Sequence, residues 1–477
     1  MVSSKGMDDD LPAWTATQVL AAFATRSLSP LEYWDCLEQH LSRWEPHVQA
    51  LYAYDPETAR REAICSTARL TRGAPKGPLD GVPVTIKELI ATAGVPVPQG
   101  TAATDLQPTV CDAPPAARLR EAGAIIFAKT TCPDFGMLTS GLSSFHPLTR
   151  NPWRLDANPG GSSSGAAAAA AAGYGPLHVG TDIGGSIRLP AALCGIVGFK
   201  PSFGRIPIDP YYFGRCAGPM TRSIADAALA MSILSRPDPR DAMSLPPQGI
   251  DWLDLHAAPT LELKGMRLGL MLEAGCGLTV DRAIIEGVVK AARLFEGAGA
   301  VIRPMDPPMT AEMLAGIDDF WRARAWNDIQ RIMPERRRCI LPYILQWAEK
   351  AASLTGTEVV AGFQQSMSMR AAAARSFQQV DAILSPTCPV VGFPAEHASP
   401  TNDPQHPFEH IAFTVLWNMG EQPALSVPCG FSDSGLPLGL QIIAPRFADR
   451  LALQLGAFLE AHGLWSAAVM PSQPADG

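Results

Sequence analysis

The chain has 477 residues, of which 47% are hydrophobic and 18% are charged, so it is long enough to bury a large core. Its formal net charge is −8, and no run of like charges stands out, which argues against a nucleic-acid groove or a basic membrane-docking face. Small neutral substrates fit this composition better than polyanions.

No stretch approaches the ~18–20 uninterrupted apolar residues of a membrane span. The first residues, MVSSKGMDDD, are acidic where a signal peptide would be basic and then apolar. The 10 cysteines lie far apart without a CxxC pair, which predicts free thiols instead of disulfides or a zinc ribbon. We therefore expect a soluble, cytoplasmic protein that does not contact membranes.

Two capping boxes predict helices near the N-terminus. Thr15 precedes Gln18 by three residues, and Ser29 precedes Glu32 with a proline at the first helical position. In the second segment, apolar residues then recur at helical spacing. The chain is therefore expected to begin with two helices.

Short apolar runs and amphipathic segments alternate through the remaining chain. The runs at 82–86, 124–128, 177–181, 301–302, 380–384, 424–427 and 438–443 read as strands. Residues 284, 288, 291 and 295 mark one face of a helix. This alternation predicts an α/β fold with a mixed central sheet, and the proline-rich stretches 236–248 and 386–408 are expected to be long loops.

The stretch GTDIGGSIRLP, residues 180–190, sets Ser186 behind two glycines. Glycine reaches the backbone conformations that let successive amides point at one place, so the N–H groups of Ile183, Gly184, Gly185 and Ser186 can form an oxyanion hole. A tight turn at the end of a strand explains the same stretch equally well.

A second glycine-serine stretch, NPGGSSSG at 158–165, precedes a run of alanines. It contains a GxSxG pattern centred on Ser163, but a nucleophile elbow needs a strand just before it, and residues 151–159 do not form one. A phosphate-binding loop would need a GK[ST] sequence, which is missing here.

Lys87 ends the apolar run 82–86 in the stretch GPLDGVPVTIKELI, residues 77–90. A lysine at such a place is ordinarily a surface residue. If it is buried, however, its pKa falls and the neutral amine can act as a base.

Together these three stretches, in this order, resemble the amidase signature family. The stretches CGIVGFKPSFGRIP (194–207), GPMTRS (218–223), NMGEQPALSVPCG (418–430) and GLPLGLQIIAP (435–445) agree with it, so the resemblance runs from about residue 14 to 465. It implies a mixed sheet covered by helices on both faces, an amidase domain over 14–465 with its catalytic core at about 77–223, and flexible ends at 1–13 and 466–477.

The resemblance also implies the roles of the site residues. Ser186 is the acylated serine, Ser162 is the bridging serine on a cis peptide bond with Gly161, and Lys87 is the terminal base, so that no histidine is needed. The supporting residues that it implies are Gly161, Ser163, Thr181, Asp182 and Arg188. Asp182 and Arg188 are expected to brace the loop as an ion pair, and Glu88 stands where many members have aspartate.

The substrate pocket is less well defined by the sequence. Candidates for its lining are Met137, Tyr211, Tyr212, Phe213 and Trp417, each of which also fits ordinary packing. The loops expected to shape it lie near 133–147, 205–216, 310–345 and 386–418. His406 and His410 have the i, i+4 spacing of metal ligands, but Pro407 interrupts the helix, so we expect exposed loop histidines and neither a metal nor another cofactor.

Two functions follow from this resemblance. The first is hydrolysis of the C–N bond of small amides, with aryl amides, esters and carbamates (urethanes) open as further substrates. The alternative is the glutamine-hydrolysing A subunit of a tRNA-dependent amidotransferase. For the first function we expect a small-molecule substrate, no nucleic-acid partner, and a monomer or homodimer.

Overall fold

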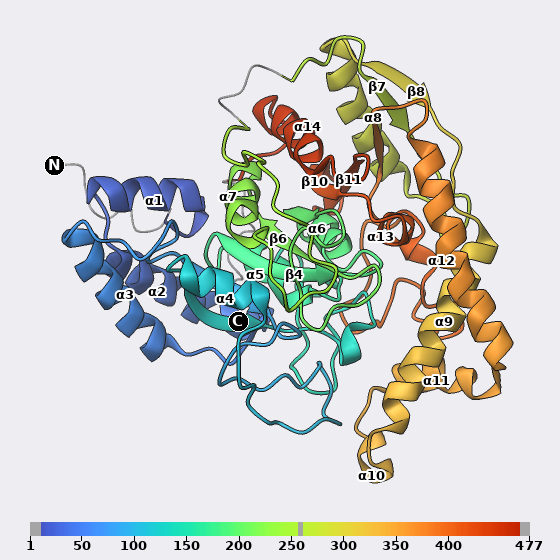
Figure 1. The fold of residues 1–477 in the computed structure, drawn as a ribbon, viewed down its shortest axis with the longest axis horizontal. Coiled ribbons are helices and arrows are strands. Elements are labelled where there is room, and N and C mark those ends of the chain that lie inside the picture. The colour runs from blue at the N-terminus through green and yellow to red at the C-terminus, as the bar shows by residue number, and fades with distance from the viewer. Residues whose placement is uncertain (1–10, 256–260, 468–477) are drawn as a thin grey trace.

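The computed structural model describes residues 11–255 and 261–467 (Figure 1). The predicted flexible ends fall largely outside these ranges, at 1–10 and 468–477, and residues 11–13 form a short turn with Leu11 buried. None of the helices within the described ranges is both long enough and apolar enough to cross a bilayer.

Eleven strands of the described residues form one sheet in the order β1-β3-β2-β4-β6-β5-β10-β11-β9-β7-β8. Their bounds are β1 (Leu51–Tyr52), β2 (Pro83–Lys87), β3 (Ile125–Thr130), β4 (Leu177–Asp182), β5 (Val197–Lys200), β6 (Cys216–Thr221), β7 (Arg267–Leu270), β8 (Val301–Pro304), β9 (Ala382–Pro386), β10 (Ala424–Phe431) and β11 (Pro437–Ile443). Strand β2 lies between β3 and β4 and is parallel to both, whereas β4 and β6 are antiparallel. The sheet is therefore mixed, as predicted.

This pairing brings together the chain segments that matter for function. Because β2 and β4 are parallel, their last residues, Lys87 and Asp182, lie at the same edge of the sheet. Because β6 runs antiparallel to β4, its first residue, Cys216, lies opposite Asp182. The loops before β6 and after β2 and β4 therefore meet at one edge.

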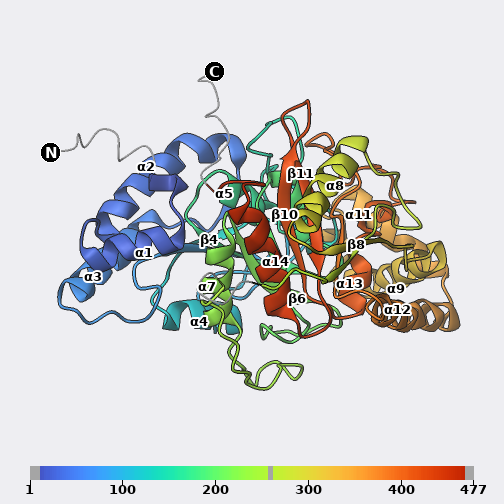
Figure 2. The same ribbon diagram turned by 90° about the horizontal axis from the view of Figure 1, so that it is seen from above.

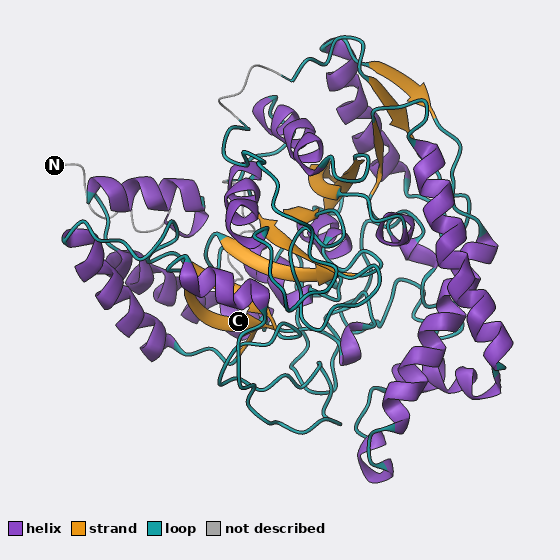
Figure 3. Ribbon diagram, viewed as in Figure 1, coloured by secondary structure: helices purple, strands orange, loops and turns teal. Residues whose placement is uncertain are grey.

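Helices cover both faces of the sheet, as Figures 2 and 3 show. Helices α7 (Ile224–Leu234), α8 (Arg282–Gly297) and α14 (Asp449–Ala461) pack on one face, while α5 (Ser164–Ala171) and α6 (Arg188–Cys194) pack on the other. The close contacts explain the small residues there: a Cβ at Gly456 of α14 would meet the Leu425 side chain at 2.6 Å, and one at Gly439 of β11 would meet the Ala192 side chain at 2.3 Å.

The N-terminal helices are α1 (Ala16–Thr25), α2 (Pro30–Val48), α3 (Pro56–Thr71) and α4 (Pro114–Glu121). The two predicted capping boxes are both formed, at Thr15 and at Ser29. The predicted helix face at 284–295 is buried in α8. The predicted strands correspond to β2, β3, β4, β8, β9, β10 and β11, and most of their ends agree to within two residues. The α/β prediction is thus confirmed.

A helical wall stands beside the sheet at the right of Figure 1, formed by α9 (Ala311–Gln330), α10 (Pro334–Arg337), α11 (Pro342–Glu349) and α12 (Gly356–Ser376), with the short α13 (Val415–Met419) against it. The expectation of loops near 310–345 was wrong. Thr310 caps α9, and the buried residues Leu314, Ile317, Trp321 and Ala325 follow helical spacing.

Candidate active site

Lys87 ends a strand whose residues are all buried, and its own side chain is fully buried. Its Nζ donates to the Ser162 Oγ at 2.8 Å and to the Ser163 Oγ at 3.0 Å. The pKa of Lys87 is lowered to about 7, chiefly because the buried ammonium loses its hydration and in part because of the positive charge of Arg215. The lysine is therefore buried against two hydroxyls and has a pKa near neutrality.

The two serines precede α5, whose eight residues are all buried. The helix can lie this deep because it is made of alanine, glycine and serine: a Cβ at Gly165 would come within 2.5 Å of the Thr131 backbone N. The Gly161–Ser162 peptide bond is cis, as the resemblance implied. Ser163 is held by Thr181, whose N–H donates to the Ser163 Oγ while that hydroxyl donates to the Thr181 carbonyl.

Ser186 lies in the turn between β4 and α6. Gly185 has a φ of 130°, which an L side chain rarely adopts, and a Cβ there would meet the Thr414 Oγ1 at 2.5 Å. The Ser163 N–H donates to the Ser186 carbonyl at 3.2 Å, so the two serine segments are joined directly. Within the described ranges the Ser186 hydroxyl makes no side-chain hydrogen bond, and it lines the same pocket as Ser162.

The four amides expected to form an oxyanion hole are not equivalent. The Gly185 N–H donates to the Asp182 Oδ1 at 2.8 Å, so this amide is already used and its predicted place in the hole is not supported. The N–H groups of Ile183, Gly184 and Ser186 donate to no other group in residues 11–255 and 261–467. Three amides beside the Ser186 hydroxyl therefore remain available as donors.

Asp182 and Arg188 form the expected ion pair. Both side chains are fully buried, and the Arg188 Nε donates to the Asp182 Oδ2 at 2.9 Å. Burial alone would raise the pKa of Asp182, but the Arg188 guanidinium outweighs it and holds that pKa below its usual range. Arg188 also donates to the side chains of Gln441 and Asn418, so the pair ties the Ser186 turn to β11 and α13.

Ser186 faces two hollows that meet at this residue. The larger is a pocket of about 220 Å³, which we call the arginine pocket, and it is lined by Leu89, Val97, Gln99, Phe135, Gly136, Met137, Ser162, Thr181, Ile183, Ser186, Pro210, Arg215 and Arg324. The smaller, of about 20 Å³, is the apolar recess, lined by Gly136, Met137, Leu138, Thr139, Ile183, Gly184, Ser186, Leu189, Trp321, Phe408 and Ile411. No histidine of the described chain lines either hollow.

Of the five residues predicted to line the pocket, Met137 does so. Tyr211 is half exposed on the surface, Tyr212 lies under the Arg324 guanidinium, and Phe213 packs on Phe363. The fifth, Trp417, was also misjudged: it is fully buried in α13 against Phe377. Aromatic residue type alone did not distinguish pocket lining from packing.

Two arginines that line the larger pocket, Arg215 and Arg324, were not predicted from the sequence. Arg215 directly precedes β6, which was not among the predicted strands, and its place follows from the pairing of β6 with the end of β4. Arg324 lies on α9, far away in sequence, and nothing in its surroundings marked it.

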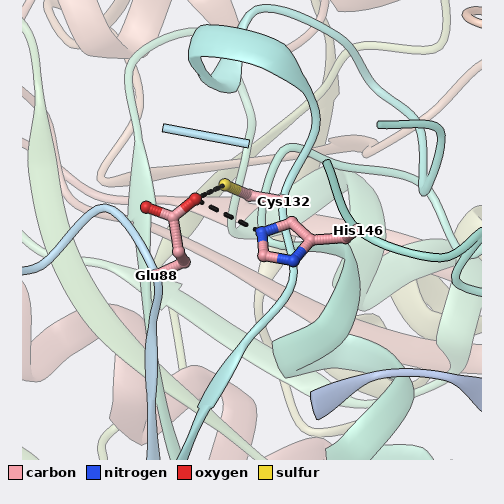
Figure 4. Close-up of side chains that lie close together, drawn as sticks. All are labelled: Glu88, Cys132 and His146. Carbon is pink, nitrogen blue, oxygen red and sulfur yellow. Dashed lines mark hydrogen bonds and ion pairs between the residues drawn. The ribbon is translucent and has the colours of Figure 1, made fainter. Parts of the chain in front are cut away.

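Glu88, Cys132 and His146 form a buried cluster next to Lys87 (Figure 4). Their ligand atoms lie within 4.8 Å of one another, so by distance they could hold a metal ion. However, the Glu88 carboxylate already accepts the N–H groups of Gln99 and Gly100, and the Cys132 thiol donates to it. Burial raises the pKa of that thiol well above its usual value, which favours a hydrogen-bonded brace.

The histidine expectation holds for only one of the two residues. His406 is exposed and hydrogen-bonded to Asp403, whereas His410 is buried, where burial lowers its pKa to about 3. It is buried because residues 409–411 form a short 3-10 turn that packs into the core between the sheet and the helical wall.

A buried lysine, serine hydroxyls and free backbone amides around one pocket on an α/β fold are the kinds of group that acyl-transfer enzymes use. The chain belongs to the amidase signature family: the family model named Amidase matches residues 36–453. Members of this family hydrolyse amide C–N bonds.

Relatives of this family cover almost the whole chain. An acylamidase of Rhodococcus erythropolis is 32% identical, with 97% of each chain covered. The A subunit of the glutamyl-tRNA(Gln) amidotransferase of Chloroflexus aurantiacus is also 32% identical, over 93% of this chain and 95% of its own. A crystal structure of a bacterial aryl acylamidase superposes with a TM-score of 0.85 at 27% identity, covering 95% of this chain and 97% of the other.

Proposed function

We propose that this chain is a stand-alone amidase, which hydrolyses the C–N bond of small amides through a Ser186–Ser162–Lys87 relay and an acyl-enzyme. The observation that carries the proposal is the hydrogen bond of 2.8 Å between the Lys87 Nζ and the Ser162 Oγ, because it is buried and involves a lysine whose pKa is lowered to about 7. Residues 14–465 are proposed as one catalytic domain, acting as a monomer or homodimer.

In the first step neutral Lys87 takes the proton of the Ser162 hydroxyl, and Ser162 takes the proton of Ser186. The Ser186 Oγ forms a bond to the carbonyl carbon of the amide, and the carbonyl oxygen becomes an oxyanion. The free N–H groups of Ile183, Gly184 and Ser186 are its proposed donors, and each lost donor of this kind typically costs about 3–4 kcal/mol.

In the second step the proton returns from Lys87 through Ser162 to the leaving nitrogen. The C–N bond breaks, the amine departs, and the acyl group stays on Ser186. Water then attacks the ester carbonyl while the same relay accepts its proton. The acid is released, and the proton returns to the Ser186 oxygen.

We further propose aryl amides, esters and carbamates as substrates. Aryl amides fit the similarity to the acylamidases, and esters and carbamates require the same acyl-enzyme chemistry. The alternative function, that of the A subunit of an amidotransferase, involves further subunits, whereas the reaction proposed here needs only this chain. No nucleic acid or membrane takes part in the proposed reaction.

The test uses the purified chain alone on aliphatic amides, anilides, p-nitrophenyl esters, aryl carbamates and glutamine. We expect turnover of amides by the chain without other proteins. Glutamine hydrolysis that appears only when the other components of an amidotransferase are added would overturn the proposal.

A fluorophosphonate probe then identifies the nucleophile by peptide mass spectrometry. We expect the adduct on Ser186 and none in Ser186→Ala, which should also lose turnover while keeping its unfolding temperature. An adduct on Ser163 would instead support the nucleophile elbow.

A further inference from the structure

Two cationic side chains, Arg215 and Arg324, line the pocket that Ser162 and Ser186 share. They come from different parts of the fold: Arg215 directly precedes β6, and Arg324 lies on α9 of the helical wall. Both side chains are partly exposed, and two like charges at one small pocket repel each other. The proposed relay does not explain why two arginines lie at this pocket.

Neither guanidinium has a strong anionic partner among the described residues. Arg215 makes no ion pair there, and its Nη1 donates to the Pro210 carbonyl at 3.2 Å. The Arg324 Nε lies 3.9 Å from the Asp328 Oδ2, at the outer limit of an ion pair and on an exposed carboxylate. Burial, and then the charge of Arg324, lower the pKa of Arg215 to about 10.

Arg324 is also held in place. Its guanidinium carbon lies 3.9 Å from the centre of the Tyr212 ring, a cation–π contact that restricts the side chain. A restricted guanidinium loses less entropy when it binds a ligand, and its planar fork matches the two oxygens of a carboxylate. An uncompensated pair of this kind is suited to a carboxylate-bearing ligand.

The two hollows differ in which serine they expose. Ser162 lines the arginine pocket but is absent from the lining of the apolar recess. In the proposed mechanism Ser162 delivers the proton to the leaving nitrogen, so the leaving amine has to lie in the arginine pocket. The acyl group then points into the recess, whose small size of about 20 Å³ favours a short acyl chain beside Leu189, Trp321 and Phe408.

We propose that the preferred substrate is an amide with an apolar acyl group and a leaving amine that carries a carboxylate, bound by Arg215 and Arg324. N-acyl amino acids and N-acyl aminobenzoates belong to this class. This inference rests on the proposed amidase function, because it assigns the two sides of the scissile bond from the relay.

Three anilides test it: N-acetyl-4-aminobenzoate, the neutral N-acetyl-4-aminoacetophenone, and glutaric acid monoanilide, which carries its carboxylate on the acyl side. The quantity measured is the ratio of kcat/KM for the first substrate to that for the second. The electronic effect of the para group on the aniline is the same in every variant, so changes in this ratio report binding of the carboxylate.

We expect Arg324→Met and Arg215→Met each to lower this ratio by about 10- to 100-fold, as loss of a charge-assisted hydrogen bond does. Arg324→Met is the decisive variant, since Arg215 also affects the pKa of Lys87. Arg282→Met, which removes an exposed guanidinium on α8, is the matched control and should leave the ratio unchanged. Unfolding temperatures identify a variant that fails to fold.

The inference is overturned if the ratio is unchanged in folded Arg324→Met, or if glutaric acid monoanilide is the best of the three in the wild type. Both results leave the amidase proposal intact, because turnover is still observed. Failure of the wild type to cleave any amide, by contrast, would contradict the proposed function itself.

Discussion

The edge of the sheet that carries Lys87 and Ser186 and the helical wall α9–α12 contribute to one site in different ways. At the sheet edge, buried polar groups have fixed partners, such as Lys87 on Ser162 and Asp182 on Arg188. The wall contributes Trp321 and Arg324 from a single helix. We infer that the reaction chemistry depends on the sheet edge and that substrate preference depends on the wall.

Close backbone packing explains why the sheet edge tolerates little change. A Cβ at Gly180 would meet the Ser163 Oγ at 2.8 Å, so even alanine there would displace a hydroxyl that Lys87 contacts. The wall approaches this edge through side chains, with Trp321 lying 3.0 Å from the position of a Cβ on Gly184. Trp321 is itself buried, but a smaller side chain at this position leaves the backbone in place.

The largest effect should come from breaking the sheet edge at Lys87. We expect Lys87→Ala to lower kcat by about 10²- to 10⁴-fold at pH 7, because it removes the proposed terminal base. In the proposed relay the neutral amine is the active form, and the pKa of Lys87 is about 7, so wild-type kcat/KM should rise as pH increases through about 7. The loss in the variant should shrink at higher pH as hydroxide replaces the amine.

A second buried lysine provides the control for this prediction. Lys129 lies on the neighbouring strand β3, and its Nζ donates to the Ile90 carbonyl at 2.7 Å. Lys129→Met should retain the rise near pH 7. The amide-to-ester rate ratio should fall in Lys87→Ala, because alkoxide leaving groups need less protonation than amines; an unchanged ratio would argue against the relay.

The next largest effect should be on stability. Arg188→Leu leaves the Asp182 carboxylate buried without its cation, and we expect the free energy of unfolding to fall by about 3–5 kcal/mol. Arg282→Leu, whose ion pair with Glu286 is exposed, should change it by less than about 0.5 kcal/mol. Urea denaturation of both variants measures the free energy of unfolding. An equal decrease in both would mean that the buried Asp182–Arg188 pair contributes no more to stability than an exposed pair.

The sequence predicted the sheet edge better than the wall, and for a physical reason. Every residue of strands β2 and β4 is buried, and neither strand carries an acidic or amine side chain before its last residue, Lys87 or Asp182, so both were recognisable as short buried strands. The occupation of the Gly185 amide by Asp182 could not be read in the same way, because it depends on the three-dimensional path of the turn.

The wall could not be predicted as part of the site. Helix α9 packs its apolar residues on the core, as any amphipathic helix does, and nothing local indicates that Trp321 and Arg324 reach a pocket. Tyr212 and Trp417 show the opposite error, since aromatic residues near the site need not line it. Side-chain destinations of this kind depend on tertiary contacts.

A change in the wall at Trp321 should alter selectivity and leave the chemistry in place. Trp321→Leu enlarges the apolar recess beside Gly184, so we expect the preference for a hexanoyl over an acetyl anilide to increase by about tenfold. The rise of kcat/KM near pH 7 should remain where it is in the wild type. A shift of that ionisation would show that the wall and the relay are not separate.

The smallest expected effect is at Tyr212, which in the proposed binding mode acts on the substrate only through Arg324. Tyr212→Leu removes the ring beneath the guanidinium, and a cation–π contact of about 0.5–1 kcal/mol corresponds to a two- to fivefold lower preference for the carboxylate anilide over its neutral counterpart. Tyr211→Leu is the matched control, because its ring is half exposed and does not line the pocket. If the two variants change the preference equally, the loop affects selectivity in some other way than by holding Arg324. If only Tyr212→Leu changes it, and the effect disappears in the Arg324→Met background, this loop affects substrate choice by positioning Arg324.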